Sequence, residues 1–119
     1  MTQQAMTPEM LIQSLQRASV SFTQVIACID HFYDFTPMAF RNGELLNAAG
    51  SNNGSCKILA FAQQHGLSET ATLNAFGDYY LVDVLQHPEA DDHQNIRNFM
   101  RHGWSGVAFE GQALVLKQD

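Results

Sequence analysis

Charged side chains are scarce in this sequence, and basic ones are the scarcest. Asp, Glu, Lys and Arg make up 15% of the 119 residues, whereas about 25% is usual in globular proteins. Six basic residues stand against twelve acidic ones, so the net charge at pH 7 is −6. A phosphate backbone and an anionic bilayer both repel such a chain. We therefore expect neither a nucleic acid nor a membrane as partner.

Cysteines and long apolar runs are also few. The two cysteines, Cys28 and Cys56, cannot form a disulfide scaffold, and we interpret both as free thiols in a reducing compartment. No segment has the pattern of a cleavable signal peptide, and no apolar run approaches the ~20 residues of a membrane span. We expect a cytoplasmic protein, with secretion without a cleavable signal peptide as the alternative.

Enough apolar residues remain for one globular core. Hydrophobic residues make up 45% of the chain, and a chain of this length buries roughly 60–70% of its unfolded surface. Residues 1–119 are therefore expected to form a single globular domain, with Met1–Met6 frayed at its start.

Apolar residues recur at spacings of three and four along most of the chain, which predicts about five amphipathic helices. The residues expected to begin them are Thr7, Ser21, Ser55, Ser68 and either Asp91 or Asp92. The residues expected to end or interrupt them are Pro37, Gly66, Gly77, Pro88 and Gly103. Residues 79–85 are expected to be helical, with a strand as the alternative. In the last helix, Ile96, Phe99 and Met100 form the predicted apolar face.

Two segments predict β-hairpins. Asn42-Gly43 lies between apolar flanks, a strong signal for a tight hairpin turn. The tail from Gly106 to Leu116 predicts two strands about a Glu110-Gly111 turn. Because a lone hairpin is marginal in water, both are expected to join one sheet. The predicted fold class is α+β: about five helices packed with a small antiparallel sheet formed from two short hairpins, Phe40–Leu46 and Val107–Leu116.

The densest polar segment is the loop Asn42–Lys57, which contains four Asn and three Gly residues. Asn and Gly tolerate positive φ, so the segment is typical of a shaped loop. We expect Gly50 and Gly54 either to have positive φ or to allow a close backbone approach. If Ser55 is an N-cap, Cys56 and Lys57 lie in the first helical turn, where free amides favour an anion.

Cys56 and His93 are the candidate catalytic residues. A thiol at a helix start beside Lys57 is expected to have a lowered pKa, as a nucleophile requires. The alternative, which we favour, is that Cys56 is a small buried apolar residue. His93, next to Asp91 and Asp92, could act as a general base, although one of these Asp residues is more simply a helix cap.

The candidate ligand-binding residues are neutral or basic polar side chains in the loop and in the last helix. They are Asn47, Asn52, Asn53, Ser55, Lys57, Asn95, Arg97 and Asn98. The alternative is structural: Asn95, Arg97 or Asn98 donates hydrogen bonds to the backbone of residues 47–54 and holds the loop. The segment does not match G-x-x-x-x-G-K-[ST], which excludes a nucleoside triphosphatase loop. No zinc-binding spacing is present, so we expect no metal and no cofactor.

The order of motifs resembles the HopJ type III effector family from about Phe22 to Leu114. The matching blocks are Phe35-Thr36-Pro37-x-x-Phe40-x-Asn42-Gly43, Asn47-x-Ala49-Gly50-x-Asn52-x-Gly54-Ser55-Cys56-Lys57, Thr72-Leu73-x-x-Phe76-Gly77-x-Tyr79-Tyr80 and His93-Gln94-Asn95-Ile96-Arg97-Asn98-Phe99-x-x-x-Gly103-Trp104. Met38 departs from the pattern, which has Thr after the Pro. The resemblance implies a small bacterial protein delivered into host cells, and it supplies no reaction, cofactor or active-site residue.

The sequence therefore leaves two predicted functions. The first, implied by the resemblance, is an effector-like interaction protein without catalysis, whose partner is a host protein or a small anionic ligand. The alternative is a small cytosolic enzyme or ligand-binding protein that uses the Asn42–Lys57 loop and Cys56. An enzyme of this kind requires a base within about 4 Å of the Cys56 sulfur in an open cleft.

Overall fold

The computed structural model describes residues 6–117. The expected fraying of residues 1–5 lies outside this range. Met6 was also expected to fray, but it packs against the hydrophobic core.

Helices α1 (Pro8–Arg17) and α2 (Phe22–Phe32) begin as the sequence predicts. The Thr7 side chain accepts a hydrogen bond from the Met10 amide at 3.2 Å, and the Ser21 side chain accepts one from the Gln24 amide at 3.3 Å. Each bond satisfies an amide that the first helical turn leaves free. The apolar faces of both helices contribute to one core.

The second helix is shorter than predicted, because Tyr33–Phe35 forms strand β1 instead of a last helical turn. Strand β1 pairs in antiparallel orientation with β5 (Leu114–Leu116), Phe35 lying opposite Leu114. The expected first hairpin is confirmed, because β2 (Phe40–Asn42) pairs with β3 (Leu45–Asn47). Its turn is shifted by one residue from the prediction: Asn42 lies opposite Leu45 at the end of β2, so the turn residues are Gly43 and Glu44.

The tail does not form the predicted hairpin. Strand β4 (Val107–Phe109) pairs with β2 to give the sheet β3-β2-β4, while β5 belongs to the separate sheet with β1. The Thr36 amide donates to the Ala113 carbonyl, and the Glu110 amide donates to the Ala39 carbonyl. The pairing of β1 with β5 and that of β2 with β4 therefore share one antiparallel register. Pro37 has no N–H to donate, which favours an interruption of the ladder at this point.

Helix α3 (Asn53–Gln64) begins three residues earlier than a cap at Ser55 predicts. Its N-cap is Asn52, at φ 56°, and not Ser55. The Cys56 amide donates to the Asn52 carbonyl at 3.0 Å, so it already has a partner within the helix. Ile58, Leu59 and Phe61 are buried as predicted, and Gly66 ends the segment with φ 64°.

After α3, the described residues form three further helices and a short 3₁₀ turn. Helix α4 (Glu69–Asn74) is capped by Ser68 as predicted. Residues Tyr79–Val84 are helical rather than extended, in the form of the π-helix η1. Helix α5 (Gln94–His102) follows, and η2 (Gly103–Gly106) leads from it to β4.

The start and the buried face of α5 differ from the prediction. Its N-cap is His93 at φ 51°, and neither Asp91 nor Asp92 caps it. Ile96 and Phe99 are buried, but Met100 is 43% exposed. Asn95 and Asn98 lie on the buried side instead, because the hairpin offers them hydrogen-bonding partners.

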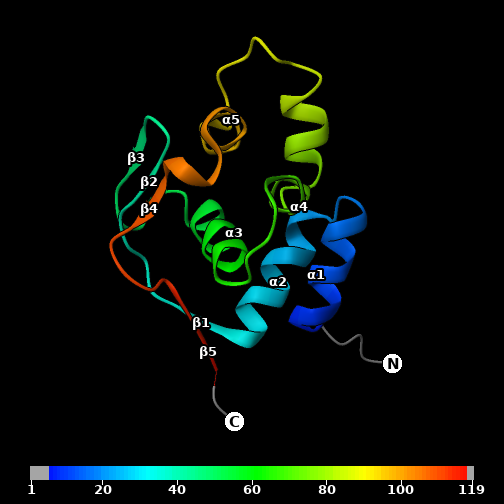
Figure 1. Cartoon of the computed structure of the whole chain (residues 1–119), viewed down its shortest axis with the longest axis vertical. Helices are drawn as coiled ribbons and strands as arrows, with labels where there is room; N and C mark the ends of the chain where they lie inside the picture. Colours follow the sequence, from blue (N-terminus) through cyan, green and yellow to red (C-terminus); the bar gives the residue numbers. More distant parts are fainter. Residues whose placement is uncertain (1–5, 118–119) are drawn as a thin grey trace.

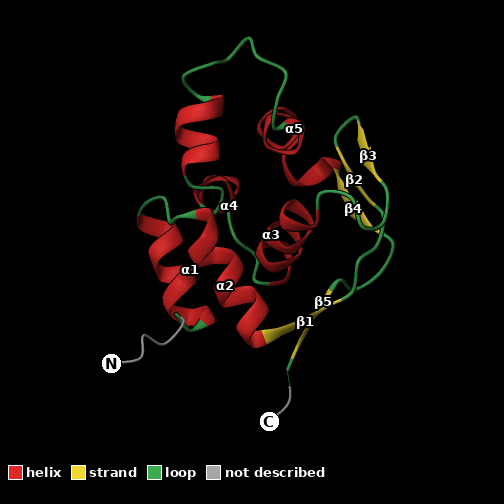
Figure 2. Ribbon diagram, turned by 180° about the vertical axis from the view of Figure 1, so that it is seen from behind, coloured by secondary structure: helices red, strands yellow, loops and turns green. Residues whose placement is uncertain are grey.

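Helix α3 lies at the centre of the molecule, between α1, α2 and α4 on one side and the sheet β3-β2-β4 on the other (Figure 1). Seen from behind, the loop after η1 arches over to the start of α5 (Figure 2). The architecture is α+β, as predicted, with two small antiparallel sheets in place of one.

Candidate functional site

A buried network of amide side chains joins the β2–β3 hairpin to α5. Asn95 Nδ2 donates to Asn47 Oδ1 at 3.0 Å, and Asn47 Nδ2 donates to Asn95 Oδ1 at 3.1 Å. Asn42 Nδ2 donates to the Asn95 carbonyl at 2.7 Å, and Asn52 Nδ2 donates to Asn47 Oδ1 at 2.7 Å. Buried amides without partners are costly, so this network fixes the loop against α5.

The prediction that the loop meets α5 is confirmed, but the contact differs in detail. Asn95 bonds the side chain of Asn47, not the backbone of residues 47–54. Asn98 Oδ1 accepts a hydrogen bond from the Glu44 amide at 3.2 Å. The prediction was wrong for Arg97, whose guanidinium donates to Asp92, Pro88 and Asp83 in the segment before α5.

Several candidate residues come together around a cavity of about 300 Å³ between the starts of α3 and α5. The lining includes Asn52, Ser55, His93 and Asn95 from the predicted set. Asn52 and His93 are also the non-glycine residues with positive φ in the described part of the chain. Phe22, Gly54, Phe76, Tyr79 and Ile96 complete the wall. Asn53 and Lys57 do not line it.

His93 is held by a carboxylate that sequence reasoning missed. Its Nε2 lies 3.0 Å from Asp83 Oδ2 on η1 and 3.8 Å from Asp92 Oδ2. The ring also packs against Tyr79, with 5.0 Å between ring centroids. The hydrogen bond from Arg97 lowers the pKa of Asp92, with smaller lowering contributions from the charges of His93 and Arg97. A His–Asp pair next to an open cavity can bind a ligand or exchange a proton with it.

Cys56 lacks the environment of an activated thiol. The residue is 1% exposed, and burial raises the pKa of its thiol to about 11, against a smaller lowering by a backbone hydrogen bond at Met38. The thiolate is therefore disfavoured at neutral pH. This removes the basis for the lowered pKa expected of Cys56, because the residue lies in the core and its amide is already bonded.

Lys57 also differs from its predicted role. Its Nζ lies 2.7 Å from Asp30 Oδ1 on α2 and 5.1 Å from the centroid of the Phe35 ring. The ammonium therefore already has an anionic partner within the chain.

The expectation that Gly50 and Gly54 have positive φ or allow a close approach is confirmed. Gly50 has φ +86°. A Cβ built on Gly54 would lie 2.6 Å from Phe22 Cζ, far inside van der Waals contact. The first glycine allows the backbone turn, and the second allows Phe22 to close over the start of α3.

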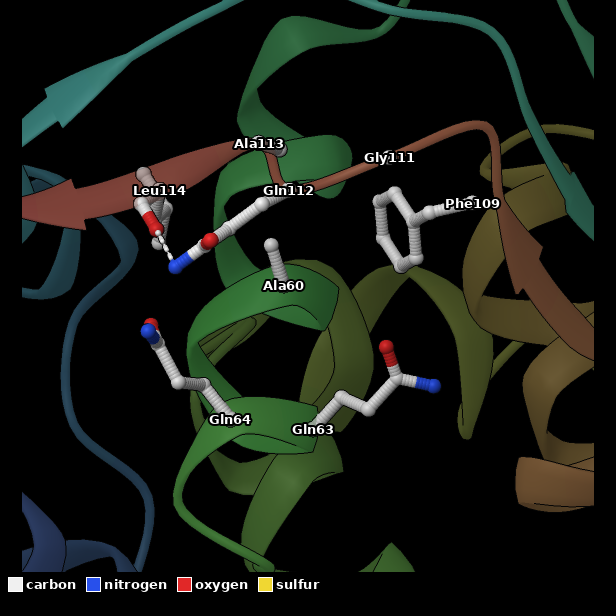
Figure 3. A pocket seen from close by; sticks show the side chains of 8 residues that line it. All are labelled: Ala60, Gln63, Gln64, Phe109, Gly111, Gln112, Ala113 and Leu114. Carbon is white, nitrogen blue, oxygen red and sulfur yellow. Dashed lines mark hydrogen bonds between the residues drawn. The ribbon is translucent and has the colours of Figure 1, made fainter.

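A second pocket lies between α3 and the connection from β4 to β5 (Figure 3). Gln63 and Gln64 project toward it from α3, and Gln112 Nε2 donates to the Leu114 carbonyl at 3.1 Å across its rim. Its lining has no titratable side chain, so it offers hydrogen bonds but no acid or base.

Within residues 6–117, no three His, Cys, Asp or Glu side chains are grouped closely enough to hold a metal ion. No helix in that range is both long and apolar enough to cross a bilayer.

Fold and site together define a small α+β protein in which an amide network holds a hairpin to a helix beside one polar cavity. The chain belongs to the HopJ type III effector protein family, whose pattern matches residues 8–114. The match extends further toward the N-terminus than the resemblance seen in the sequence.

A solved structure has the same fold. It is the crystal structure of VPA0580, described as a protein of unknown function, with 47% sequence identity and a TM-score of 0.92. The similarity covers 96% of this chain and 97% of that one. A comparison with curated proteins finds no match.

Proposed function

We propose that this protein is a HopJ-type effector that acts by binding another protein, without a reaction of its own. The observation that carries the proposal is a group of exposed apolar side chains on and beside η1. They are 39–45% exposed and comprise Tyr79, Leu81, Val82, Leu85 and, on α5, Met100. Clustered apolar surface of this kind is typical of protein interaction sites.

The form of η1 supports this interpretation. A π-helix is rare and tends to occur at functional positions. The η1 helix, yellow-green in Figure 1, stands at the edge of the molecule next to α4 and α5. Leu81 and Val82 are each 39% exposed on this helix, while Val84, 2% exposed, anchors it to the core.

The test is site-specific photo-crosslinking in an extract of host cells. A photoreactive residue at Val82 should give one adduct that excess unlabelled protein abolishes. The same residue at Leu46, which is 71% exposed on the hairpin, is the matched control and should give none. Equal adducts at both positions, or none at Val82, would contradict the proposal.

Delivery into host cells is part of the same proposal, supported by family membership. The protein would be synthesised in the bacterial cytoplasm and exported without a cleavable signal peptide. A reporter fused to its C-terminus should reach host cells from a strain with a working type III system. Equal delivery from a strain without that system would argue against it.

A second function, small-ligand binding, is favoured by the cavity between α3 and α5. The His93–Asp83 pair and the polar side chains of Asn52 and Ser55 are available to a ligand there. Helices α3 and α5 begin at this cavity without a capping side chain, whereas α1, α2 and α4 are capped. The cavity therefore also offers amide donors to a small polar or anionic ligand.

Phosphate and sulfate titrations followed by amide NMR test this second function. Saturable shifts at residues 53–55 and 94–95 are expected, together with a shift of the His93 ring signals. The variant Asp83→Asn should alter the His93 response. Linear shifts without saturation would remove the ligand site and leave the binding-protein proposal untouched.

A further inference from the structure

The surface beside η1 includes a groove of about 330 Å³ between the end of η1, the turn at Pro88 and helix α5. Five of its eight lining residues are apolar: Val84, Leu85, Pro88, Ala90 and Met100. Leu85 and Met100 are also 45% and 43% exposed. The groove is thus continuous with the exposed apolar side chains described above.

The charge around the groove is strongly one-sided. Residues 78–92 contain five of the twelve acidic residues of the chain and no Lys or Arg. Glu89 and Asp91 flank the groove residue Ala90, and both are exposed. Among residues 6–117, neither forms an ion pair. An acidic rim therefore borders the apolar floor.

Two arginines, Arg97 and Arg101, line the groove itself, and each has a carboxylate partner within the chain. Arg97 has a side chain only 9% exposed, and it donates to Asp92 Oδ1 at 2.8 Å and to the Asp92 carbonyl at 2.6 Å. It is committed to holding the segment before α5. Arg101 also lines the groove and is 63% exposed, and its Nη1 lies 3.6 Å from Glu44 Oε2 on the hairpin.

We propose that this groove docks a basic amphipathic helix of a partner protein, an inference that rests on the proposed function. The apolar stripe of that helix would enter between Leu85 and Met100, and its Lys or Arg side chains would face Glu89 and Asp91. Helix-in-groove recognition of this kind uses anchors spaced by three and four residues.

The walls of the groove favour a helix over an extended peptide. Two of its walls, η1 and α5, are helical, and their backbone groups are bonded within those helices. None of the groove residues lies in a strand, so an extended peptide finds no strand edge to pair with, whereas a helix brings its own backbone bonds. The acidic rim also disfavours an RNA, an anionic bilayer and a second copy of this chain, whose net charge is −6.

The probe is a labelled peptide of about 18 residues with Leu at helical spacing and Lys at all other positions, long enough to form a helix. A peptide of the same Leu pattern with Glu in place of Lys is the matched control. Binding is followed by fluorescence anisotropy, and NMR locates the contact. The Lys peptide should bind saturably with shifts at Val84, Leu85, Ala90 and Met100, and the Glu peptide at least about tenfold more weakly.

Three variants locate the site. Leu85→Ser with Met100→Gln should weaken binding of the Lys peptide about tenfold or more, as expected for loss of central apolar anchors. Glu89→Gln with Asp91→Asn should weaken it about two- to fivefold and reduce its salt dependence. Leu46→Ser, on the hairpin, should leave it unchanged. Each variant should keep the melting temperature of the wild type, because the changed side chains are exposed.

Several results would overturn the proposal: equal binding of the two peptides, shifts centred away from the groove, binding unaffected by Leu85→Ser with Met100→Gln, or self-association that buries the groove. Binding to anionic vesicles that the same double variant abolishes would assign the groove to a membrane instead.

These experiments distinguish failure of the groove proposal from failure of the proposed function. An adduct at Val82 that persists in Leu85→Ser with Met100→Gln would support a binding protein while rejecting this groove. Peptide binding without any host adduct would support the groove while rejecting the effector interaction.

Discussion

Asn47 and Asn95 exchange two hydrogen bonds through their side-chain amides, at 3.0 and 3.1 Å, although 48 residues separate them in the chain. Both are nearly fully buried, with exposures of 2% and 6%. The pair connects the end of β3 to the first turn of α5. It therefore fixes the loop that contains most of the candidate residues.

Replacing Asn95 should destabilise the fold. Asn95→Ala removes three buried side-chain hydrogen bonds, two with Asn47 and one with Asn42. Asn42 keeps its bond to the backbone carbonyl of residue 95, and Asn47 keeps its bond from Asn52, so we expect a loss of about 1–3 kcal/mol in the free energy of unfolding. Urea unfolding measures it. Asn53→Ala is the control, because Asn53 is exposed, and it should change stability by less than about 0.5 kcal/mol. Equal effects of the two variants would refute the structural role.

Valine at Gly50 and valine at Gly54 should each destabilise the protein, for different reasons. Gly50→Val places a β-branched residue at φ +86°, which is expected to cost about 1–3 kcal/mol. Gly54→Val brings the new side chain into the Phe22 ring.

The two mechanisms are distinguished by combining each change with Phe22→Ala and measuring unfolding in urea. Phe22→Ala should reduce the destabilisation that Gly54→Val causes and leave the destabilisation that Gly50→Val causes unchanged. Identical behaviour of the two glycines in the Phe22→Ala background would contradict this explanation.

The cysteines should make stability fall in alkaline solution. Burial raises the pKa of Cys56 from 9.0 to about 11, and burial followed by the charge of Glu9 raises that of Cys28 from 9.0 to about 11. The unfolded chain loses these protons first, so their contribution is complete below pH 9 and is lost between pH 9 and about 11.

The measurement is urea unfolding from pH 7 to 11 in the wild type and in Cys28→Ala with Cys56→Ala. The wild type should lose more stability over the upper half of this range than the double variant. Parallel pH profiles, or rapid alkylation of Cys56 in the native protein at pH 7, would show that the thiols are accessible.

Lys57→Ala should have little effect on stability. The Lys57–Asp30 pair is partly exposed, with Asp30 at 50%, and such pairs contribute about 0–1 kcal/mol. Because Lys57 does not line the cavity, the variant should also leave any phosphate-induced shifts at residues 53–55 unchanged. Loss of those shifts in Lys57→Ala would show that Lys57 contributes to ligand binding.

Interactions within a few residues were readable from the sequence alone. The caps at Thr7, Ser21 and Ser68 and the hairpin turn at Gly43 each depend on a side chain or backbone preference that acts within one turn. The polar composition of the loop and of α5 also predicted that they meet, because buried or irregular backbone requires partners. These local and compositional signals sufficed for the α+β class and for most of the helices.

Tertiary structure decided the rest. Local pattern cannot distinguish pairing of β4 with β5 from pairing with β2 and β1, which lie more than sixty residues earlier. The left-handed N-caps Asn52 and His93 replace the predicted caps because Asn52 bonds Asn47 and His93 bonds Asp83. The burial of Cys56, which raises its pKa, likewise follows from the packing of α3 at the centre of the molecule.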